Sequence, residues 1–192
     1  MSGKKGETRQ LDFDEHVRMD ASLSDMTKLA PVFSKTGTVT AGNSSGITDG
    51  ASATVLVSED EARRRNLKPI ARIIDYSVAG VDPKIMGIGP VPAVRKLLAK
   101  TGMNLDQFDL VEINEAFAAQ VIACLRDLPV DPNRVNVNGG AIALGHPIGC
   151  TGSRIVTTLV HEMQKRNARY GLATLCISGG MGLALAVEAV AS

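Results

Sequence analysis

Two apolar stretches near the end of the chain constrain its fold more than any other feature. Residues 171–178 (GLATLCIS) and 182–190 (GLALAVEAV) contain almost no polar side chains, and a short glycine-containing turn joins them. Strands without polar alternation are buried on both faces, so the sheet that contains them needs helices on each side. The two stretches therefore predict an α/β domain of three layers.

The preceding sequence supplies further elements of such a domain. Strand-like runs of apolar and β-branched residues occur at residues 53–58, 69–80 and 108–113. With the two final strands they predict a sheet of five strands. Helical patterns occur at residues 59–66, 91–100, 115–128 and 152–166. The third helix is apolar around nearly its whole circumference, which predicts burial, and the fourth carries an apolar stripe that predicts packing on the sheet.

The first part of the chain has a different character. Residues 1–50 are polar and rich in turn-forming residues. They predict irregular structure with at most one short helix, at residues 23–29.

The overall composition limits the classes of function. The 192 residues carry 21 Lys and Arg against 20 Asp and Glu, a formal net charge of +1. Bulk electrostatics therefore gives no reason to expect nucleic acid or a membrane surface as a partner. The three cysteines are widely spaced and form no CxxC pair, which is typical of a reducing compartment. With no transmembrane-length apolar run and no signal-peptide pattern, the sequence predicts a cytoplasmic protein of one domain or slightly more.

His146 lies in a segment of unusual glycine content. The sequence NVNGGAIALGHPIGCTGSRI, residues 136–155, holds five glycines, one proline and no charge before Arg154. Glycine lets the backbone turn sharply or approach a neighbour closely, and it weakens structure elsewhere. This density favours a histidine that is presented for a function, next to a helix N-terminus that could stabilise negative charge. A histidine that only supports a tight turn is the alternative.

Other polar positions follow predicted strands. Cys176 ends a buried strand directly before a glycine turn, which is where α/β proteins bind ligands, although a small core residue is the alternative. Asn114, in the sequence INEAF, follows the strand at residues 108–113, and taken alone it favours an ordinary helix N-cap. The loop AGNSSG, residues 41–46, fits either a ligand cradle or a flexible loop. The sequence contains neither GxGxxG nor GxxxxGK[ST], so the nucleotide-binding fingerprints are absent.

Taken together, five segments resemble the thiolase family. TVTAGNSSGITDGAS, GVDPKIMGIGPVPA, VEINEAFAAQ, VNVNGGAIALGHPIGCTGSRI and GLATLCISGGMG occur in the order and at the spacing of thiolases. The resemblance covers essentially the whole chain and is closest to the C-terminal half of biosynthetic, acetoacetyl-CoA-type thiolases. It implies a thiolase-like three-layer half-domain with a mixed five-stranded sheet at residues 48–192. Residues 1–47 would form the C-terminal part of the loop domain, which contacts CoA.

The resemblance also implies catalytic roles. His146 would activate an acylating thiol, and Cys176 would serve as acid and base in the Claisen step. Asn114 would hold a water that, with His146, stabilises the thioester oxygen as it becomes an enolate. Ser178 stands where many thiolases have a glycine whose backbone N–H completes a second oxyanion hole. The reaction would convert two acetyl-CoA into acetoacetyl-CoA and CoA, or the reverse, with CoA thioesters as substrates and neither a metal nor a further cofactor.

Residues that contact CoA carry over in the same way. The positions that match thiolase contacts to the pantetheine arm, the acyl region or the ADP end are Arg18, Phe33, Ser45, Met86 and Phe117.

One residue that the resemblance requires has no match. Thiolases carry the acylating cysteine in their N-terminal half, and neither Cys124 nor Cys150 fits its place. We therefore expect a truncated gene product, an engineered fragment or one subunit of a split enzyme, inactive alone. Its expected partners are a complementary N-terminal half or full-length chain and further copies in a homo-oligomer. A non-catalytic thiolase-like module that binds CoA or a partner protein is the alternative, and the retained catalytic residues favour the enzyme.

Overall fold

A mixed sheet of four strands forms the centre of the molecule. The computed structural model describes residue 10 and residues 12–190. The strands are β1 (Ala71–Gly80), β2 (Leu110–Ile113), β3 (Tyr170–Ile177) and β4 (Met181–Ala189), in the order β1-β4-β3-β2. The β1–β4 and β3–β4 pairs are antiparallel, whereas β2 and β3 run parallel. The carboxyl ends of β2 and β3 therefore point to the same edge of the sheet.

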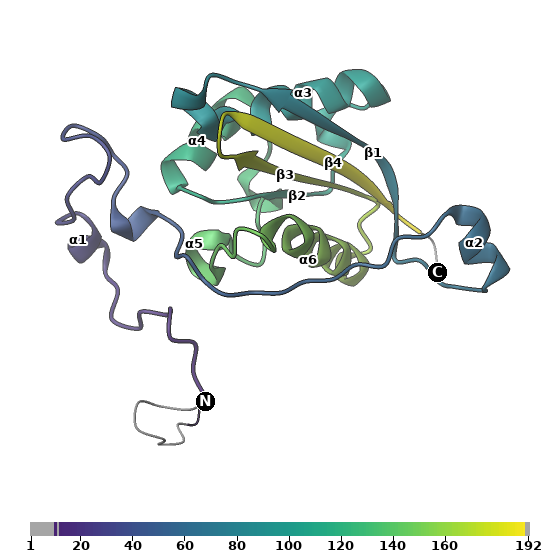
Figure 1. Cartoon of the computed structure of the whole chain (residues 1–192), viewed down its shortest axis with the longest axis horizontal. Coiled ribbons are helices and arrows are strands. Elements are labelled where there is room, and N and C mark those ends of the chain that lie inside the picture. Colours follow the sequence, from purple (N-terminus) through teal and green to yellow (C-terminus); the bar gives the residue numbers. More distant parts are fainter. Residues whose placement is uncertain (1–9, 11, 191–192) are drawn as a thin grey trace.

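Helices lie on both faces of this sheet (Figure 1). The α-helices are α1 (Leu23–Met26), α2 (Glu59–Arg64), α3 (Pro90–Thr101), α4 (Ala118–Asp127), α5 (Ala141–Leu144) and α6 (Thr151–Arg166). Short 3₁₀ helices are η1 (Ala41–Asn43), η2 (Pro83–Ile88), η3 (Leu105–Gln107) and η4 (Pro132–Arg134). The core under α3 and α4 includes Val94 and Cys124, and a second core under α6 includes Ile155 and Leu159. The predicted three-layer α/β architecture is confirmed.

The ends of α3 follow the sequence signals closely. Pro90 occupies the first turn, where a missing N–H costs nothing. Gly102 ends the helix with a φ of 69°, and its N–H donates to the Leu98 carbonyl at 2.9 Å. This left-handed conformation favours glycine because it lacks a Cβ.

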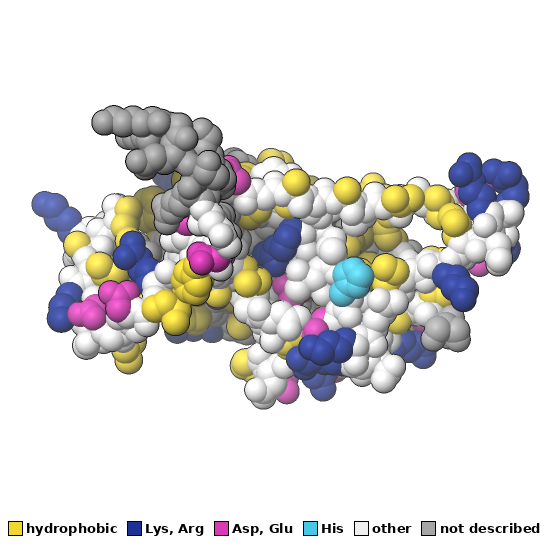
Figure 2. All heavy atoms as spheres, turned by 90° about the horizontal axis from the view of Figure 1, so that it is seen from below, with side chains coloured by type: hydrophobic (Ala, Val, Ile, Leu, Met, Phe, Trp, Pro, Cys, Tyr) yellow, Lys and Arg dark blue, Asp and Glu magenta, His cyan; other side chains and the backbone are white. Residues whose placement is uncertain are grey.

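The prediction of five strands is wrong. Residues 53–58 form no strand in the structure, and Val55 and Leu56 are 90% and 73% exposed. A strand is stable only when its backbone groups pair with a neighbour, and this segment has no such partner among the described residues. Figure 1 shows it as an extended path that leads to α2, and Figure 2 shows hydrophobic side chains spaced along this path. On the opposite edge, a single parallel bridge between Val111 and Val135 extends the sheet beyond β2.

The expectation that the helix at residues 115–128 is buried is also wrong. In α4 the buried residues are Gln120, Val121 and Cys124, whereas Ile122 is 54% exposed. One side of α4 packs on the core, and its outer side has no further layer over it in the described structure. Apolar content therefore overstated the burial of this helix.

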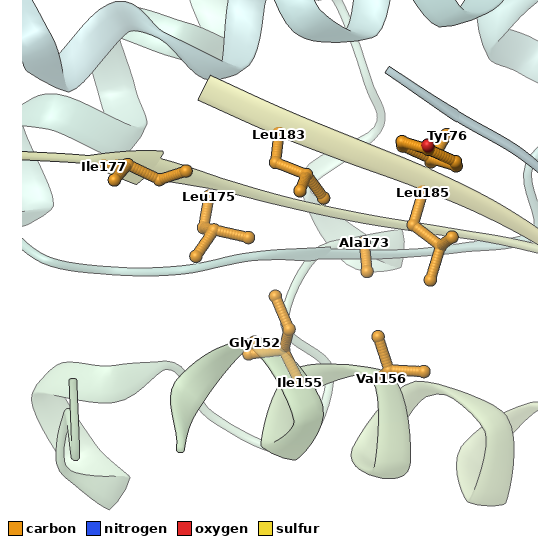
Figure 3. Close-up of a pocket in the computed structure, with 9 residues that line it drawn as sticks. All are labelled: Tyr76, Gly152, Ile155, Val156, Ala173, Leu175, Ile177, Leu183 and Leu185. Carbon is orange, nitrogen blue, oxygen red and sulfur yellow. The ribbon is translucent and has the colours of Figure 1, made fainter. Parts of the chain in front are cut away.

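Helix α6 leaves part of its sheet face open. An apolar groove of about 320 Å³ lies between the helix and the strands. Figure 3 shows Leu175 and Leu183 of the sheet directed toward Ile155 of α6 across this groove. Tyr76 of the edge strand β1 also lines it and is 58% exposed. The structure thus combines an open apolar face with the unpaired extended segment at residues 53–58.

Gly182→Ala tests the close approach between β4 and the start of α3. A Cβ on Gly182 would overlap the carbonyl group of Gly89. We expect the free energy of unfolding to fall by about 1–3 kcal/mol, the range for overpacked cores, measured by chemical denaturation with circular dichroism. Gly152→Ala is the control, because a Cβ there meets no atom within 4 Å. Equal losses in the two variants would contradict this packing argument.

Candidate active site

Asn114 lies at the carboxyl end of β2. Its backbone N–H donates to the Thr174 carbonyl of β3 at 2.9 Å, and its side chain is 1% exposed. Helix α4 begins only at Ala118 with Phe117 as its N-cap, so Asn114 does not cap this helix. Its Oδ1 atom is buried and has no hydrogen-bond partner among the described residues. A buried amide oxygen without a partner is costly, and it marks this position as one for a water or a ligand.

The loop that carries His146 is fixed by its neighbour at residues 45–50. The His146 N–H donates to the Gly46 carbonyl at 3.0 Å. Gly145 has a φ of 96°, and a Cβ there would overlap the side chain of Thr48. Glycine at this position therefore allows both the left-handed turn and the close approach of the two loops. This geometry explains glycine at position 145, and the presentation of His146 for a function stays a prediction.

The two motif residues Asn114 and His146 meet directly. Asn114 Nδ2 lies 3.3 Å from His146 Nε2, and on the other side of the ring His146 Nδ1 lies 2.7 Å from Thr151 Oγ1. Burial, and secondarily the positive charge of Arg154, lower the pKa of His146. The imidazole is therefore neutral at pH 7, and a neutral imidazole can accept a proton.

Two further side chains hold the histidine loop against β2. Glu115 Oε2 accepts the Ile142 N–H at 3.1 Å, which satisfies a donor in the first turn of α5. The amide of Asn136 accepts from the Ile113 N–H and donates to the Ile113 carbonyl, both at 2.9 Å. Asn136 thereby pairs with both backbone groups of Ile113, as a neighbouring strand would do at the end of β2. Neither role was predicted from the sequence, and the only available signal was that Glu115 directly follows Asn114 in the sequence INEAF.

Cys176 and Ser178 lie at the same edge of the sheet, one strand away from Asn114. Cys176 is close to the carboxyl end of β3 and 9% exposed, and burial raises the pKa of its thiol. Ser178 begins the exposed turn that continues with Gly179 at φ 86° and Gly180 at φ 90°. Among the described residues, asparagines are the only non-glycine positions with positive φ. Ser178 therefore has an ordinary backbone conformation, in which serine can present its N–H as glycine does.

The residues matched to CoA contacts are only partly brought together. The backbone N–H and the hydroxyl of Ser45 both donate to the Ala116 carbonyl, at 3.0 and 3.1 Å. The rings of Phe33 and Phe117 pack edge to face with centroids 5.5 Å apart. Arg18 is exposed on the N-terminal segment, and Met86 is half-buried in η2. Among the described residues, neither the Ser45 hydrogen bonds nor the contact between the Phe33 and Phe117 rings involves Arg18 or Met86.

A buried ion pair lies beneath the site. Glu112 of β2 is 3% exposed, and its Oε2 lies 4.0 Å from Nη1 of Arg154 on α6. Burial raises the pKa of Glu112 from 4.5 to about 7, because the charge of Arg154 offsets only part of the desolvation cost. Nη1 of Arg154 is buried and has no hydrogen bond within the described part of the chain. No sequence pattern had indicated this pair, since its members are 42 residues apart.

Two family models match the chain. Residues 67–189 match "Thiolase, C-terminal domain" and residues 1–60 match "Thiolase, N-terminal domain". The chain belongs to the thiolase family. The division into residues 1–47 and 48–192 stays a prediction.

Relatives with names and structures agree with this membership. The acetyl-CoA acetyltransferase of Paracoccus denitrificans is 60% identical over 98% of this chain and 48% of its own length. The human mitochondrial 3-ketoacyl-CoA thiolase is 52% identical over 98% of this chain and 47% of its own length. The thiolase chain thus spans about half the length of these relatives.

Solved thiolase structures share the fold. The crystal structure of the Bacillus anthracis acetyl-CoA acetyltransferase has a TM-score of 0.89 at 54% identity, covering 92% of this chain and 45% of that one. Human mitochondrial 3-ketoacyl-CoA thiolase in complex with CoA has a TM-score of 0.86 at 50% identity, covering 94% and 46%. Within the described residues, no helix has the length and apolar character that crossing a membrane requires.

Glu112→Gln tests the buried acid through the pH dependence of stability. Because the pKa is raised in the folded chain to about 7, folding binds a proton, and the stability that this provides is lost as pH rises from 4.5 to about 7. The loss is about 3 kcal/mol. We expect the glutamine variant to lack this decline in urea denaturation across that range.

Glu162→Gln is the matched control for this prediction. Hydrogen bonds from Asn138 and Arg166 lower the pKa of Glu162, so its contribution to stability is lost as pH falls, the opposite direction. A Glu112→Gln variant with the same pH profile as the wild-type chain would show that the carboxyl group does not have a raised pKa.

Proposed function

We propose that this chain is the C-terminal portion of a thiolase-type acyltransferase that condenses two acetyl-CoA into acetoacetyl-CoA and CoA, or catalyses the reverse thiolysis. The observation that carries the proposal is the 3.3 Å contact between Asn114 Nδ2 and His146 Nε2. It joins the INEAF sequence to the glycine-rich segment at residues 136–155, at the sheet edge that also carries Cys176. The similarity to acetyl-CoA acetyltransferases and to a CoA-bound thiolase supports the same reaction class.

In this proposal His146 activates an acylating thiol supplied by a part of the enzyme outside this chain. The neutral imidazole takes the thiol proton at Nε2, and the sulfur attacks the thioester carbon. The acyl group then moves to the enzyme sulfur, and the CoA sulfur leaves and recovers the proton from His146. Splitting the reaction into two acyl transfers is the usual advantage of a covalent intermediate.

Cys176 moves the second proton. As a thiolate it removes a proton from the methyl group of the second acetyl-CoA, and the resulting carbon attacks the acyl-enzyme carbonyl and expels the enzyme sulfur. In thiolysis, its thiol returns that proton to the departing carbon. The raised pKa of Cys176 favours the thiol at neutral pH, which is the form that thiolysis requires.

Asn114 and Ser178 stabilise negative charge on the thioester oxygens. The partnerless, buried Oδ1 of Asn114 suits the ordered water that the resemblance implies there, next to His146. The Ser178 N–H, at the turn after Cys176, serves the second oxyanion. Preorganised donors of this type are a major source of rate enhancement in acyl transfer.

The substrate enters as a CoA thioester along the loop that precedes the site. We assign Ser45, Phe33, Phe117 and Met86 to the pantetheine and acyl region, and Arg18 to the ADP end. The Phe33 and Phe117 pair supports this assignment, because it forms an apolar surface beside Ser45. No metal or additional cofactor is part of the proposal.

We propose a complementary N-terminal thiolase half, within a homo-oligomer, as the protein partner. Val55 and Leu56 lie in the segment that matches the N-terminal domain model, and they are highly exposed. The open groove beside α6 is the second apolar surface that such a partner would cover. We also propose a cytoplasmic location, which the three free thiols support.

Two substitutions separate the proposed proton transfers once the complementary half is supplied. His146→Ala should suppress formation of the acyl-enzyme by roughly 10²–10⁴-fold, as expected for loss of a general base. Cys176→Ala should leave the acyl-enzyme intact but reduce condensation by a similar factor, because no group moves the carbon-bound proton. Mass spectrometry measures acylation, and steady-state rates measure condensation.

Cys150→Ala is the matched control for Cys176→Ala, since Cys150 is a free, half-buried thiol with no assigned role. It should retain both activities. Normal acylation in His146→Ala together with failed acylation in Cys176→Ala would reverse the two roles and refute the mechanism.

The exposed apolar surfaces predict how the chain behaves alone. We expect the 192-residue chain to self-associate in sedimentation velocity, and the complementary half to convert it into a defined complex. Replacing Val55 and Leu56 with serine should weaken self-association because both side chains are exposed in the free chain. A well-folded, monodisperse monomer of the unmodified chain would contradict this expectation.

A further inference from the structure

Thr151 is a fully buried hydroxyl placed behind the histidine. It is the first residue of α6 and is 0% exposed. Its Oγ1 lies 2.7 Å from His146 Nδ1, and the same hydroxyl donates to the Pro147 carbonyl at 3.0 Å. The hydroxyl therefore contacts the ring nitrogen opposite the one that faces Asn114.

The donors and acceptors around His146 are consistent with one particular protonation of the ring. A threonine hydroxyl has one proton to donate and two lone pairs that accept. When the hydroxyl donates to the Pro147 carbonyl, which also accepts the Thr151 N–H at 2.9 Å, it acts as an acceptor toward His146, and Nδ1 carries the hydrogen. A neutral imidazole has only one such hydrogen, so Nε2 is unprotonated. Asn114 Nδ2, a donor, faces Nε2 at 3.3 Å, which agrees with the same assignment.

The opposite tautomer would require two coordinated changes. The Thr151 proton would have to leave the Pro147 carbonyl and turn toward Nδ1. The Asn114 amide would also have to turn over, so that its oxygen faces a hydrogen on Nε2. The Nδ1–H tautomer keeps the Thr151 donation to the Pro147 carbonyl and the Asn114 Nδ2 contact as they stand.

We propose that Thr151 is a positioning residue that fixes His146 as the Nδ1–H tautomer and leaves Nε2 free to accept a proton. This inference rests on the proposed function, in which Nε2 takes the proton of the acylating thiol. Once Nε2 is protonated, Nδ1 still carries its hydrogen and still donates to Thr151. The hydroxyl thus keeps its contact with both the neutral and the charged ring, and it holds the ring orientation through the proton transfer.

Nitrogen NMR of the histidine ring tests the tautomer in the 192-residue chain without any enzymatic assay. With ¹⁵N-labelled imidazole, each ring nitrogen reports directly whether it carries a hydrogen, and the His146→Ala spectrum assigns the signals. At a pH where the ring is neutral, we expect Nδ1 protonated and Nε2 unprotonated. A wild-type spectrum with the hydrogen on Nε2 would overturn the inference by itself.

Substitutions then test whether Thr151 is the cause. Thr151→Val keeps the shape but removes the hydroxyl and should lose the dominant Nδ1–H signature, whereas Thr151→Ser should retain it. Thr157→Val is the matched control, because Thr157 makes the same hydroxyl contact one turn back in α6, to the Ser153 carbonyl at 2.9 Å, away from any histidine. Unchanged protonation in Thr151→Val would overturn the assigned role. If that variant does not fold, Thr151→Ala provides the same comparison.

A kinetic measurement on the reconstituted enzyme separates this inference from the proposed function. Thr151→Val should slow acylation roughly 10- to 100-fold, the range seen when hydrogen-bond partners of metal-bound histidines are removed, and Thr151→Ser should recover most of the rate. Impaired His146→Ala with wild-type acylation in Thr151→Val would refute the role of Thr151 alone. Normal acylation in His146→Ala would refute the proposed function, whereas the tautomer result would stand independently.

Discussion

The contact between Asn114 and His146 is the interaction on which the rest of the site depends. One partner lies at the end of a buried strand, and the other lies on a glycine-rich loop that could adopt many conformations by itself. The loop is held by three separate attachments: to the Gly46 carbonyl, to the Glu115 carboxylate and to the edge of β2 through Asn136. Each attachment is a hydrogen bond between residues that are far apart in the sequence. The position of His146 therefore depends on the folding of the whole domain.

Burial gives this site its chemistry. The lowered pKa of His146 and the raised pKa values of Cys176 and Glu112 share one leading cause, the desolvation of a charged form. In the proposed function, the neutral imidazole and the protonated thiol at this sheet edge are the groups that exchange protons with the substrate. The helices on both faces of the sheet contribute to these pKa shifts, because they exclude water from the buried groups.

Local signals in the sequence predicted much of the fold. The helix predicted at residues 91–100 corresponds to α3 (Pro90–Thr101), and the apolar runs at residues 171–178 and 182–190 identified the central hairpin, because backbone preference and burial act within a few residues. The segment at residues 53–58 failed for the complementary reason. Its residues do favour a strand, but a strand also needs a hydrogen-bonded neighbour. That pairing depends on residues far away in the sequence, which local strand propensity does not describe.

The candidate site could likewise be predicted only in part from local sequence. Glycine density favoured a function for His146, whereas the roles of Asn114 and Cys176 were implied only by the resemblance to thiolases. The roles of Asn136 and Thr151 were not predictable, because an amide that replaces a strand neighbour and a hydroxyl that contacts an imidazole leave no periodic pattern. The Glu112–Arg154 pair escaped for the same reason, as it forms only when β2 and α6 pack together.

A crystal structure of the chain joined with its complementary half and bound to acetyl-CoA would test the central claim most directly. We expect the thioester carbonyl to lie beside His146 Nε2, so that the ring can donate to the oxygen at about 2.7–3.1 Å once Nε2 has taken the proton of the acylating thiol. We also expect an ordered water on Asn114 and the substrate methyl group facing Cys176. A thioester bound elsewhere on the chain, with His146 and Asn114 still in contact only with each other, would contradict this claim.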